Sequence, residues 1–557
     1  MFKKLLIPPR KVSLRKGFYK LTDTAVLKFY QDDSISSEGY KIEILPDGTQ
    51  IYSATEAGSF YAIQTLKDLA VIYNDKVPCC VIDDKPDFAR RGVYLDCSRG
   101  KVPKLSTLKH LVERLAHWKI NELQLYIENV FTFKKHPEIG KGYSPFTPAE
   151  ILDLQEYCKK YHIRLVGSLA SFGHFERVLS LPKYQNLGEL AGYRGYPGGT
   201  TLCPTDPGSI KLVSDLYSEF VPLFEADDFN VCCDETWELG EGRSKKLADK
   251  IGKGELYLQF LLKIYNLCQK YGKRMNVWAD IVLKHPELLK KLPKDIVMLN
   301  WEYEAEGKNI YRTKEIAKAG LPFMVCPGTS SWLTHGTRMP ASMGNITNFA
   351  KQGRKFGAEG LLNTDWGDQG HRNLLGVSLH SFAHGAAQSW NGKAVDNENF
   401  TDNFCFNFFS QKDNKLSKAI QKLGRNYITC GTNVPNRSWL YLALIEPAKN
   451  IEPDSYIYQM NDKGLKEIIN RTALAKARHT NSFENIALEE IVLAQEMDKL
   501  AAKRALALKH KNYSELKNVS KEIQKMADEF KRLWLIRNKP SRLKDNLKLF
   551  KKAAENF

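Results

Sequence analysis

The sequence predicts an α/β fold, a (β/α)8 TIM barrel, with an N-terminal α+β domain and a C-terminal helical domain. From Arg91 onward, short apolar runs alternate with amphipathic helical stretches, which is the pattern of βα units. Eight such runs occur within about 300 residues, the expected content of this barrel. The 557-residue chain is too long for one ordinary core. We therefore expect domains at residues 1–85, 86–395 and 396–557.

The N-terminal segment is predicted to pair strands and cover them with a helix. Residues 40–45 alternate at period two, residues 46–48 give a Pro-Asp-Gly turn signal, and residues 50–54 supply the partner strand. Residues 58–66 have helical spacing. Residues 78–86, which begin and end with proline, are predicted to be a linker to the next domain.

The predicted barrel strands are short apolar runs that end in polar or aromatic residues. Clear helical segments follow most of them, such as 108–118 and 148–161. Strand signals stop after residue 392, and residues 404–557 have helical spacing, with a loop around 429–437. The eight predicted strands are residues 92–96, 122–128, 164–168, 229–235, 275–278, 296–301, 322–326 and 360–363.

The composition is typical of a soluble globular protein. No apolar stretch approaches the ~20 residues that span a membrane, and the basic start of the chain is a poor signal peptide. The net charge is +18, but residues 501–557 carry 16 Lys and Arg against 6 Asp and Glu. This excess favours a solvated lysine face over an anionic partner, and the stretch has no nucleic-acid signature. We therefore expect no nucleic-acid or membrane partner.

The 11 cysteines follow no metal-site spacing and suggest no disulfide framework. The simplest interpretation of these cysteines is that they are buried, reduced thiols in a reducing compartment. A cytoplasmic location is the expectation that follows, although a longer leader would be invisible in this sequence.

Two neighbouring acids end the fourth predicted strand. Residues 229–233 form an apolar run typical of a buried parallel strand, and Asp234 and Glu235 follow directly. A (β/α)8 barrel places its chemistry at the carboxyl ends of its strands. One of two adjacent acids in a cleft is expected to hold a proton, and a protonated acid beside an anion suits glycosidic bond cleavage. The structural alternative is a helix cap, where acids are also favourable.

Other strand ends carry residues that suit a carbohydrate. A sugar ring offers apolar C–H faces and a rim of hydroxyls, so it needs aromatic walls with carboxylate or arginine partners. Each of these residues also has a structural interpretation: a tryptophan alone is more often core, His174 could be a surface residue, and Arg91 could pair with Glu128. Four of the nine tryptophans fall at or just after strand ends, namely Trp278, Trp301, Trp332 and Trp366.

Several common catalytic motifs are missing from the sequence. There is no GxSxG elbow, Walker loop, GxGxxG after a strand or HExxH motif. No His, Cys and carboxylate residues show metal-ligand spacing. A hydrolase without cofactor or metal is therefore the simplest remaining enzyme class.

Taken in order, the motifs resemble glycoside hydrolase family 20, the β-N-acetylhexosaminidases, and especially its hexosaminidase D-like branch. The resemblance covers about residues 20–392. It rests on residues 91–99 as the opening strand, Gly173-His174 as a loop motif and Cys233-Asp234-Glu235 as the Asp-Glu signature. Residues 236–242, 366–368 and 383–390 continue the similarity.

The resemblance implies retaining, substrate-assisted hydrolysis, an exception to the usual scheme with two carboxylates. The nucleophile would be the 2-acetamido oxygen of the substrate, which forms an oxazolinium intermediate. Glu235 would be the general acid and then the base, and Asp234 would hold the acetamido N–H.

The resemblance also implies binding roles. Arg91 and Asp368 would hold ring hydroxyls, and Trp278, Trp301 and Trp366 would wall the sugar. Glu128 and His174 would set charge and orientation around the pair. Many members place a Tyr after strand seven, but this chain has Trp332 there. Either Tyr303 replaces that Tyr from the preceding strand end, or its hydrogen bond is lost.

We therefore expect an exo-acting enzyme whose partner is an oligosaccharide or glycoconjugate with a terminal β-linked GlcNAc or GalNAc. Two alternatives stay open at this point. One is another retaining hydrolase of acetamido sugars, and the other is a sugar-binding protein on the same scaffold with weak or no activity. The sequence leaves the oligomeric state open.

Overall fold

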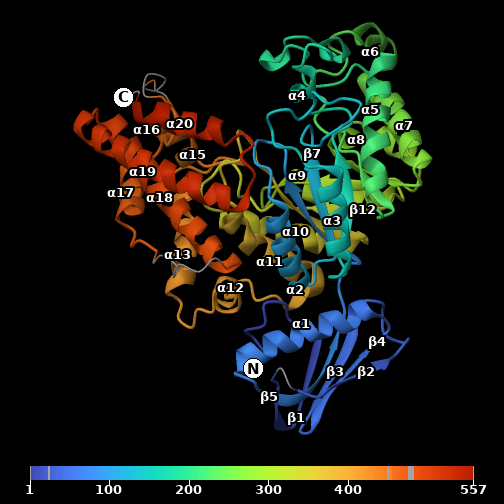
Figure 1. Cartoon of the computed structure of the whole chain (residues 1–557), viewed down its shortest axis with the longest axis vertical. Helices are drawn as coiled ribbons and strands as arrows, with labels where there is room; N and C mark the ends of the chain where they lie inside the picture. Colours follow the sequence, from blue (N-terminus) through green and yellow to red (C-terminus); the bar gives the residue numbers. More distant parts are fainter. Residues whose placement is uncertain (1, 23–24, 448–451, 453–454, 475–481, 556–557) are drawn as a thin grey trace.

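The computed structural model describes the chain except residues 1, 23–24, 448–451, 453–454, 475–481 and 556–557. A small sheet with one covering helix comes first, then a closed barrel, then a group of helices packed beside the barrel (Figure 1). The predicted fold class is confirmed.

The N-terminal sheet has the strand order β1-β5-β3-β4-β2, and α1 (Glu56–Tyr73) packs across it. Thr55 caps this helix by accepting a hydrogen bond from the Gly58 N–H at 3.3 Å. The predicted hairpin is present as β3 and β4. The strands are β1 (Lys11–Lys20), β2 (Leu27–Gln31), β3 (Tyr40–Leu45), β4 (Gly48–Ser53) and β5 (Lys76–Asp84).

The linker predicted at residues 78–86 is wrong for most of its length, because β5 (Lys76–Asp84) occupies it. This strand pairs with both β1 and β3. Pro78 lies next to an irregularity in the register of β1, between Leu14 and Phe18. A proline is tolerated in a sheet where a bulge interrupts the ladder, so it did not stop this strand.

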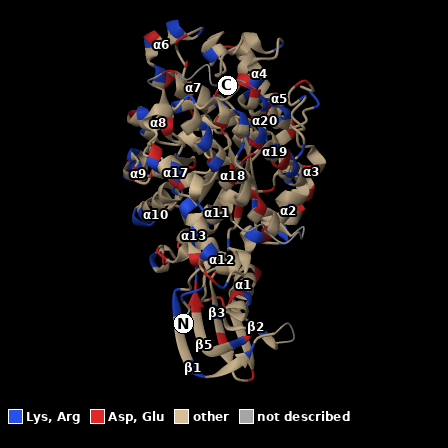
Figure 2. Ribbon diagram, turned by 90° about the vertical axis from the view of Figure 1, so that its left-hand side faces the viewer, with Lys and Arg blue, Asp and Glu red and all other residues tan. Residues whose placement is uncertain are grey.

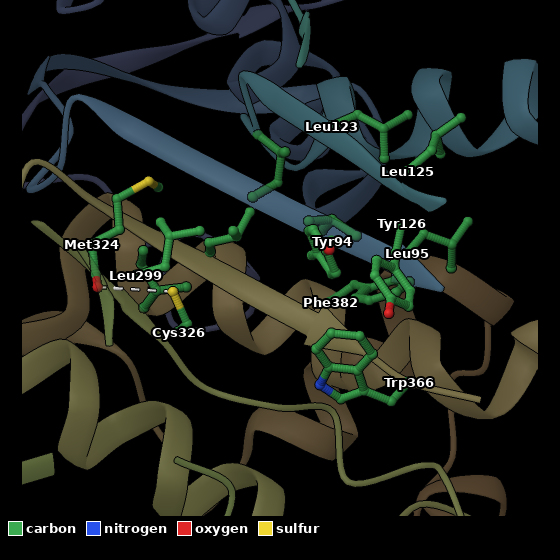
Figure 3. Packing of buried hydrophobic residues seen from close by; sticks show 14 of the residues in the cluster. Tyr94, Leu95, Leu123, Leu125, Tyr126, Leu299, Met324, Cys326, Trp366 and Phe382 are labelled. Carbon is green, nitrogen blue, oxygen red and sulfur yellow. Dashed lines mark hydrogen bonds between the residues drawn. The ribbon is translucent and has the colours of Figure 1, made fainter. Parts of the chain in front are cut away.

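Eight parallel strands close the barrel in the order β6 to β13. Each overlaps one predicted strand. The buried apolar cluster of the barrel and its helices includes Leu123 and Leu125 of β7, Leu299 of β11 and Met324 of β12 (Figure 3). The strands are β6 (Arg90–Asp96), β7 (Glu122–Ile127), β8 (Arg164–Leu169), β9 (Asp228–Asn230), β10 (Arg274–Trp278), β11 (Val297–Trp301), β12 (Phe323–Cys326) and β13 (Gly360–Asp365).

Helices surround the barrel and connect its strands, as the alternating pattern predicted (Figure 1). The α-helices are α2 (Leu105–His117), α3 (Pro148–Lys159), α4 (Glu176–Leu179), α5 (Pro207–Phe220), α6 (Lys245–Ile251), α7 (Lys253–Lys270), α8 (Asp280–Lys284), α9 (Lys308–Lys318), α10 (Met339–Phe356) and α11 (Leu375–Asn391). Short 3-10 turns are η1 (Gln185–Leu187), η2 (Tyr193–Gly195), η3 (Val221–Leu223), η4 (Pro286–Lys290) and η5 (Gly392–Ala394).

The C-terminal helices form a second apolar cluster beside the barrel. The long helix α18 packs on α11, and Glu490 of α18 pairs with Arg537 at 3.0 Å with both side chains buried. The helices are α12 (Phe400–Phe409), α13 (Lys415–Leu423), α14 (Asn426–Thr429), α15 (Trp439–Ala443), α16 (Tyr456–Gln459), α17 (Asp462–Asn470), α18 (Phe483–Lys509), α19 (Tyr513–Arg537) and α20 (Leu543–Glu555).

Charged residues are dispersed on the face shown in Figure 2, where Lys and Arg alternate with Asp and Glu over the C-terminal helices. Within the described part of the chain, no helix combines the length and apolar character that crossing a membrane requires. All 11 cysteines are buried and unbridged.

Candidate active site

The predicted acid pair lies just beyond a strand that is shorter than expected. β9 ends at Asn230 rather than at Glu235. The backbone then turns, because the Asn230 side chain accepts the Cys232 N–H at 2.9 Å. Cys232, Cys233 and Glu235 all have left-handed backbone, with φ of 59°, 63° and 48°. Non-glycine residues in this region carry strain that is most often found at functional sites.

His174 lies between the two acids, and its predicted role of setting charge around the pair stays a prediction. Its Nε2 lies 3.3 Å from Asp234 Oδ2 and 3.5 Å from Glu235 Oε2. Burial by itself would lower the pKa of His174, but the Asp234 carboxylate and its hydrogen bond raise it to about 10. Gly173 permits this approach, since a Cβ there would lie 2.3 Å from the Asp234 carbonyl oxygen. The second carboxylate oxygen of Asp234, Oδ1, is buried and has no protein partner.

The surroundings of Glu235 favour the protonated form of its carboxyl group. Burial raises the pKa of its carboxyl group and the Asp234 anion adds to this, against opposing effects of His174 and Arg99. The side chain is 33% exposed, so it can reach a ligand. A third acid, Asp280, accepts the Glu235 backbone N–H at 3.3 Å, and burial raises the pKa of Asp280 to about 7.

Arg91 does not lie in this site, so the prediction that it binds sugar hydroxyls is wrong. It is the second residue of β6 and therefore lies at the amino end of the barrel. Its guanidinium is fully buried, donates to Glu38 at 2.6 Å and to the Lys119 carbonyl at 2.8 Å, and lies over the Trp390 ring. The structural alternative holds for Arg91, with Glu38 rather than Glu128 as its partner.

Arg99 is the arginine that the structure brings to the acids. It follows the carboxyl end of the same strand and lies 2.9 Å from Asp96, 3.6 Å from Glu128 and 3.6 Å from Asp368. Its guanidinium lies over the rings of Tyr126 and Trp366, 5.0 Å from each ring centroid. Arg99 stands within the family motif of residues 91–99, but the predicted sugar-binding role was given to Arg91. The position of the two arginines relative to the strand ends was the signal that could have separated them.

Glu128 and Asp368 lie at the strand-end rim, on either side of Arg99. Glu128 is buried and accepts a hydrogen bond from the Tyr126 hydroxyl at 3.0 Å, and burial raises its pKa to about 7. The Asp368 side chain is 39% exposed and is therefore accessible to a hydroxyl-bearing ligand.

An aromatic wall surrounds the acids. The Trp366 ring lies beside Tyr94 and Tyr126, with centroids 5.2 and 5.3 Å away (Figure 3). Trp278 lies 6.0 Å from Trp366, and the indole N–H groups of Trp278 and Trp301 are buried without a protein acceptor. Unpartnered polar groups facing aromatic surface are typical of a ligand site.

Tyr303 joins this wall from the end of β11. Its hydroxyl accepts the Trp366 indole N–H at 2.8 Å, so its own proton remains available for another acceptor. Its ring stacks on Trp301 with 5.1 Å between centroids and meets Trp332 edge-on at 4.9 Å. Trp332 is buried, and it is connected to the site through its contact with Tyr303. Direct contact between Trp332 and a sugar stays a prediction.

Two groups of acids and His174 have the spacing that a metal ion could use, one with Glu128 and Glu176 and one with Asp234 and Glu235. A histidine binds a metal ion only as the neutral imidazole. Because the pKa of His174 is raised to about 10, His174 is a cation near neutral pH and fits the role of a counter-ion. Arg99 places a second cation beside Glu128.

The segment between α19 and α20, together with the start of α20, contacts the loops of the rim. The Arg542 N–H donates to Gly100 O at 3.1 Å, beside Arg99, and Asn546 Nδ2 donates to Gly370 O at 2.7 Å, beside Asp368. The Ser541 N–H donates to Ser144 Oγ at 3.1 Å. These distant residues therefore fix loops that follow β6, β13 and β7, which no local sequence signal could indicate.

Comparison with family models gives two adjoining matches. Residues 88–406 match the model of the glycosyl hydrolase family 20 catalytic domain, and residues 2–85 match domain 2 of the same family. The catalytic match alone covers more than half of the chain.

Similar curated proteins include the Beta-hexosaminidase of Porphyromonas gingivalis, 24% identical over 286 residues, which are 44% of this chain and 36% of that protein. Human Hexosaminidase D is 22% identical over 308 residues, 52% of this chain and 62% of that protein. The alignments thus span less than two thirds of either relative.

Solved structures share the fold. A chitobiase from Flavobacterium johnsoniae superposes with a TM-score of 0.61 at 16% identity, covering 95% of this chain and 99% of that one. A Vibrio harveyi exo β-N-acetylglucosaminidase in complex with N-acetylglucosamine gives 0.59 at 17% identity, covering 76% of this chain and 78% of that one.

Proposed function

Since the chain belongs to glycosyl hydrolase family 20, we propose that it is an exo-acting, retaining β-N-acetylhexosaminidase that uses the 2-acetamido group of its substrate as nucleophile. The observation that carries this proposal is the unequal surroundings of two adjacent acids. Asp234 faces a cationic His174 and keeps one buried oxygen open, whereas Glu235 is partly exposed with a raised pKa.

Glu235 is the proton donor in this mechanism. The raised pKa favours the protonated carboxyl group, which donates its proton to the glycosidic oxygen as the bond breaks. As a carboxylate it then removes a proton from the water that attacks the intermediate. The Asp280 carboxylate, bound to the Glu235 N–H, holds the backbone of this residue in place.

Asp234 and Tyr303 hold the acetamido group of the substrate between them. The open Asp234 Oδ1 accepts the acetamido N–H and stabilises positive charge as it develops. The Tyr303 hydroxyl donates to the acetamido oxygen, since its own acceptor site is already used by Trp366. Burial raises the pKa of Tyr303, which keeps it a donor. Fixing the acetamide against the anomeric carbon is a proximity effect of up to about 7–11 kcal/mol.

The closed end of the pocket binds the rest of the sugar. Arg99 takes the role that sequence analysis gave to Arg91, and with Asp368 it binds ring hydroxyls. Trp366 and Trp278 enclose the apolar faces of the ring. The substrate is therefore a glycan or glycoconjugate with a terminal β-linked GlcNAc or GalNAc.

Paired aryl 2-acetamido glucosaminide and galactosaminide substrates test the reaction and its sugar preference. We expect hydrolysis with retained β configuration by NMR, and inhibition by a thiazoline mimic of the oxazolinium ion. No turnover of either substrate, together with retained binding of N-acetylhexosamine, would favour the inactive sugar-binding alternative.

Glu235→Gln tests the acid role through the leaving group. We expect the largest loss of kcat/KM on substrates with poor leaving groups, because good leaving groups need little protonation. Glu241→Gln is the matched control, since Glu241 follows in the same segment but is exposed and paired with Lys253. An equal loss for all leaving groups would contradict the assignment.

A further inference from the structure

Trp237 lies beside Glu235, and Arg194 lies over the Trp237 ring. Trp237 comes two residues after Glu235, and its backbone N–H donates to the Glu235 carbonyl oxygen at 2.8 Å. Its ring meets the His174 ring edge-on, with centroids 5.6 Å apart. The Arg194 guanidinium lies over the Trp237 ring at 3.7 Å. In the proposed mechanism Glu235 faces the leaving group. Side chains next to Glu235 are therefore candidates to contact that group.

The two loops that carry these residues are tied together. The buried Glu238 carboxylate accepts four groups, the N–H and hydroxyl of Thr200 and of Thr201, at 2.6–3.0 Å. Buried Glu189 accepts the N–H and hydroxyl of Ser244 at 3.1 and 2.7 Å. The loop after β8 is thus anchored to the loop after β9, which makes this wall a preformed surface.

The Arg194 charge is not neutralised by the protein. Among the residues that the structure describes, no carboxylate lies within ion-pair distance of Arg194, and the side chain is exposed. The same holds for Arg177 on this wall, whose hydrogen bond goes to the Tyr143 hydroxyl at 3.2 Å. Arg194 has a φ of 50°, a conformation that the surrounding loop must hold in place.

We propose that Trp237 and Arg194 bind the residue to which the terminal N-acetylhexosamine is linked, and that Arg194 selects a leaving group with negative charge. The ligand class is an acidic sugar, with a carboxylate or a sulfate ester within reach of the guanidinium fork. Trp237 supplies apolar contact to the ring of this sugar. This inference rests on the proposed function, because it assigns the leaving-group side of the same site.

Matched disaccharides test the selectivity. The terminal sugar is the one preferred in the aryl assay, and the second sugar is glucose, glucuronic acid or glucose sulfate. We expect kcat/KM to be about tenfold higher for the acidic pairs at low salt and to approach the neutral value at high salt. The uronic acid and sulfate arms distinguish the two sources of charge.

Arg194→Gln is expected to bring the ratio of acidic to neutral kcat/KM close to one, and Arg194→Lys to leave an intermediate ratio. Trp237→Leu should lower kcat/KM for both disaccharides relative to the aryl glycoside. Lys211→Gln is the control, because Lys211 is an exposed cation on α5 that is paired with Asp215. A wild-type ratio of one, or a ratio unchanged in Arg194→Gln, would overturn the proposal.

Calorimetric binding to the Glu235→Gln variant makes the test independent of turnover. We expect tighter binding of the acidic disaccharide than of the neutral one, and loss of that difference when Arg194→Gln is added. Equal affinities, or no binding of either disaccharide, would also overturn the proposal. Aryl turnover without charge selectivity would reject this inference alone and leave the proposed function standing.

Discussion

Arg91 and Arg99, near the two ends of β6, should have different effects when each is replaced by methionine. Arg91 lies at the amino end of the strand and Arg99 just beyond its carboxyl end. Methionine keeps an apolar stem of similar reach and removes the charge in both cases. Arg91→Met should therefore reduce stability alone, whereas Arg99→Met should reduce catalysis and, because the buried Asp96 and Glu128 lose a partner, stability as well.

The cost at Arg91 follows from its contacts. Breaking a fully buried ion pair costs about 3–5 kcal/mol. Glu38 is 20% exposed and keeps a hydrogen bond from Asn121 at 2.9 Å, so part of that cost is relieved. We expect a loss of about 2–3 kcal/mol in the free energy of unfolding. At temperatures where the variant is folded, kcat/KM should stay within about twofold of wild type, given that Arg91 contacts no residue of the site.

The cost at Arg99 concerns the substrate. A hydrogen bond from a charged group to a sugar hydroxyl contributes about 1.5–3 kcal/mol, which corresponds to roughly 10- to 150-fold in kcat/KM. The assay is kcat/KM on the aryl 2-acetamido glycoside, measured beside thermal unfolding for both variants. A loss of more than about tenfold in kcat/KM with unchanged stability in Arg91→Met would contradict this prediction. Wild-type activity in Arg99→Met would also contradict it.

Further predictions concern the groups around the acids. Tyr303→Phe should lower kcat by about 10²–10³ with little change in KM, because a donor aimed at developing charge is lost; an effect on KM alone would contradict this. His174→Asn removes a cation that lowers the pKa of Glu235, so that pKa rises and the alkaline limb of the kcat/KM pH profile moves to higher pH; a shift to lower pH would reverse the assigned sign. Gly328→Ala places a Cβ 2.5 Å from Trp332 and 2.8 Å from Tyr303, so kcat should fall through displacement of Tyr303; unchanged kcat would argue against tight positioning.

Apolar periodicity was sufficient to predict the barrel because buried parallel strands are short, continuous apolar runs between helices. It failed at β5, where Pro78 suggested a linker, since the bulge that accommodates it depends on β1. It also overextended the fourth strand. Cys232 and Cys233 are apolar and buried, yet their backbone is left-handed, with the Asn230 side chain accepting the Cys232 N–H and the Tyr257 hydroxyl donating to the Cys233 carbonyl at 2.9 Å.

The acid pair could be singled out because it ends a buried apolar run, and only the order of the surrounding motifs favoured an active site over a helix cap. The arginine assignment could not be made on residue type, as both candidates stand near one strand and only strand polarity separates them. Asp280 follows the fifth strand, and its bond to the Glu235 N–H is visible only in space. The same is true of the hydrogen bond between Trp366 and Tyr303.

The alkylation rates of the eleven buried, unbridged cysteines can report local opening of the structure. A thiol reacts as its thiolate, and burial both blocks access and raises the pKa of groups such as Cys158 and Cys268. Cys79 lies in the N-terminal sheet, Cys232 beside the acids and Cys430 among the C-terminal helices. Timed alkylation followed by peptide mapping would therefore report the order in which these regions open, without any engineered probe.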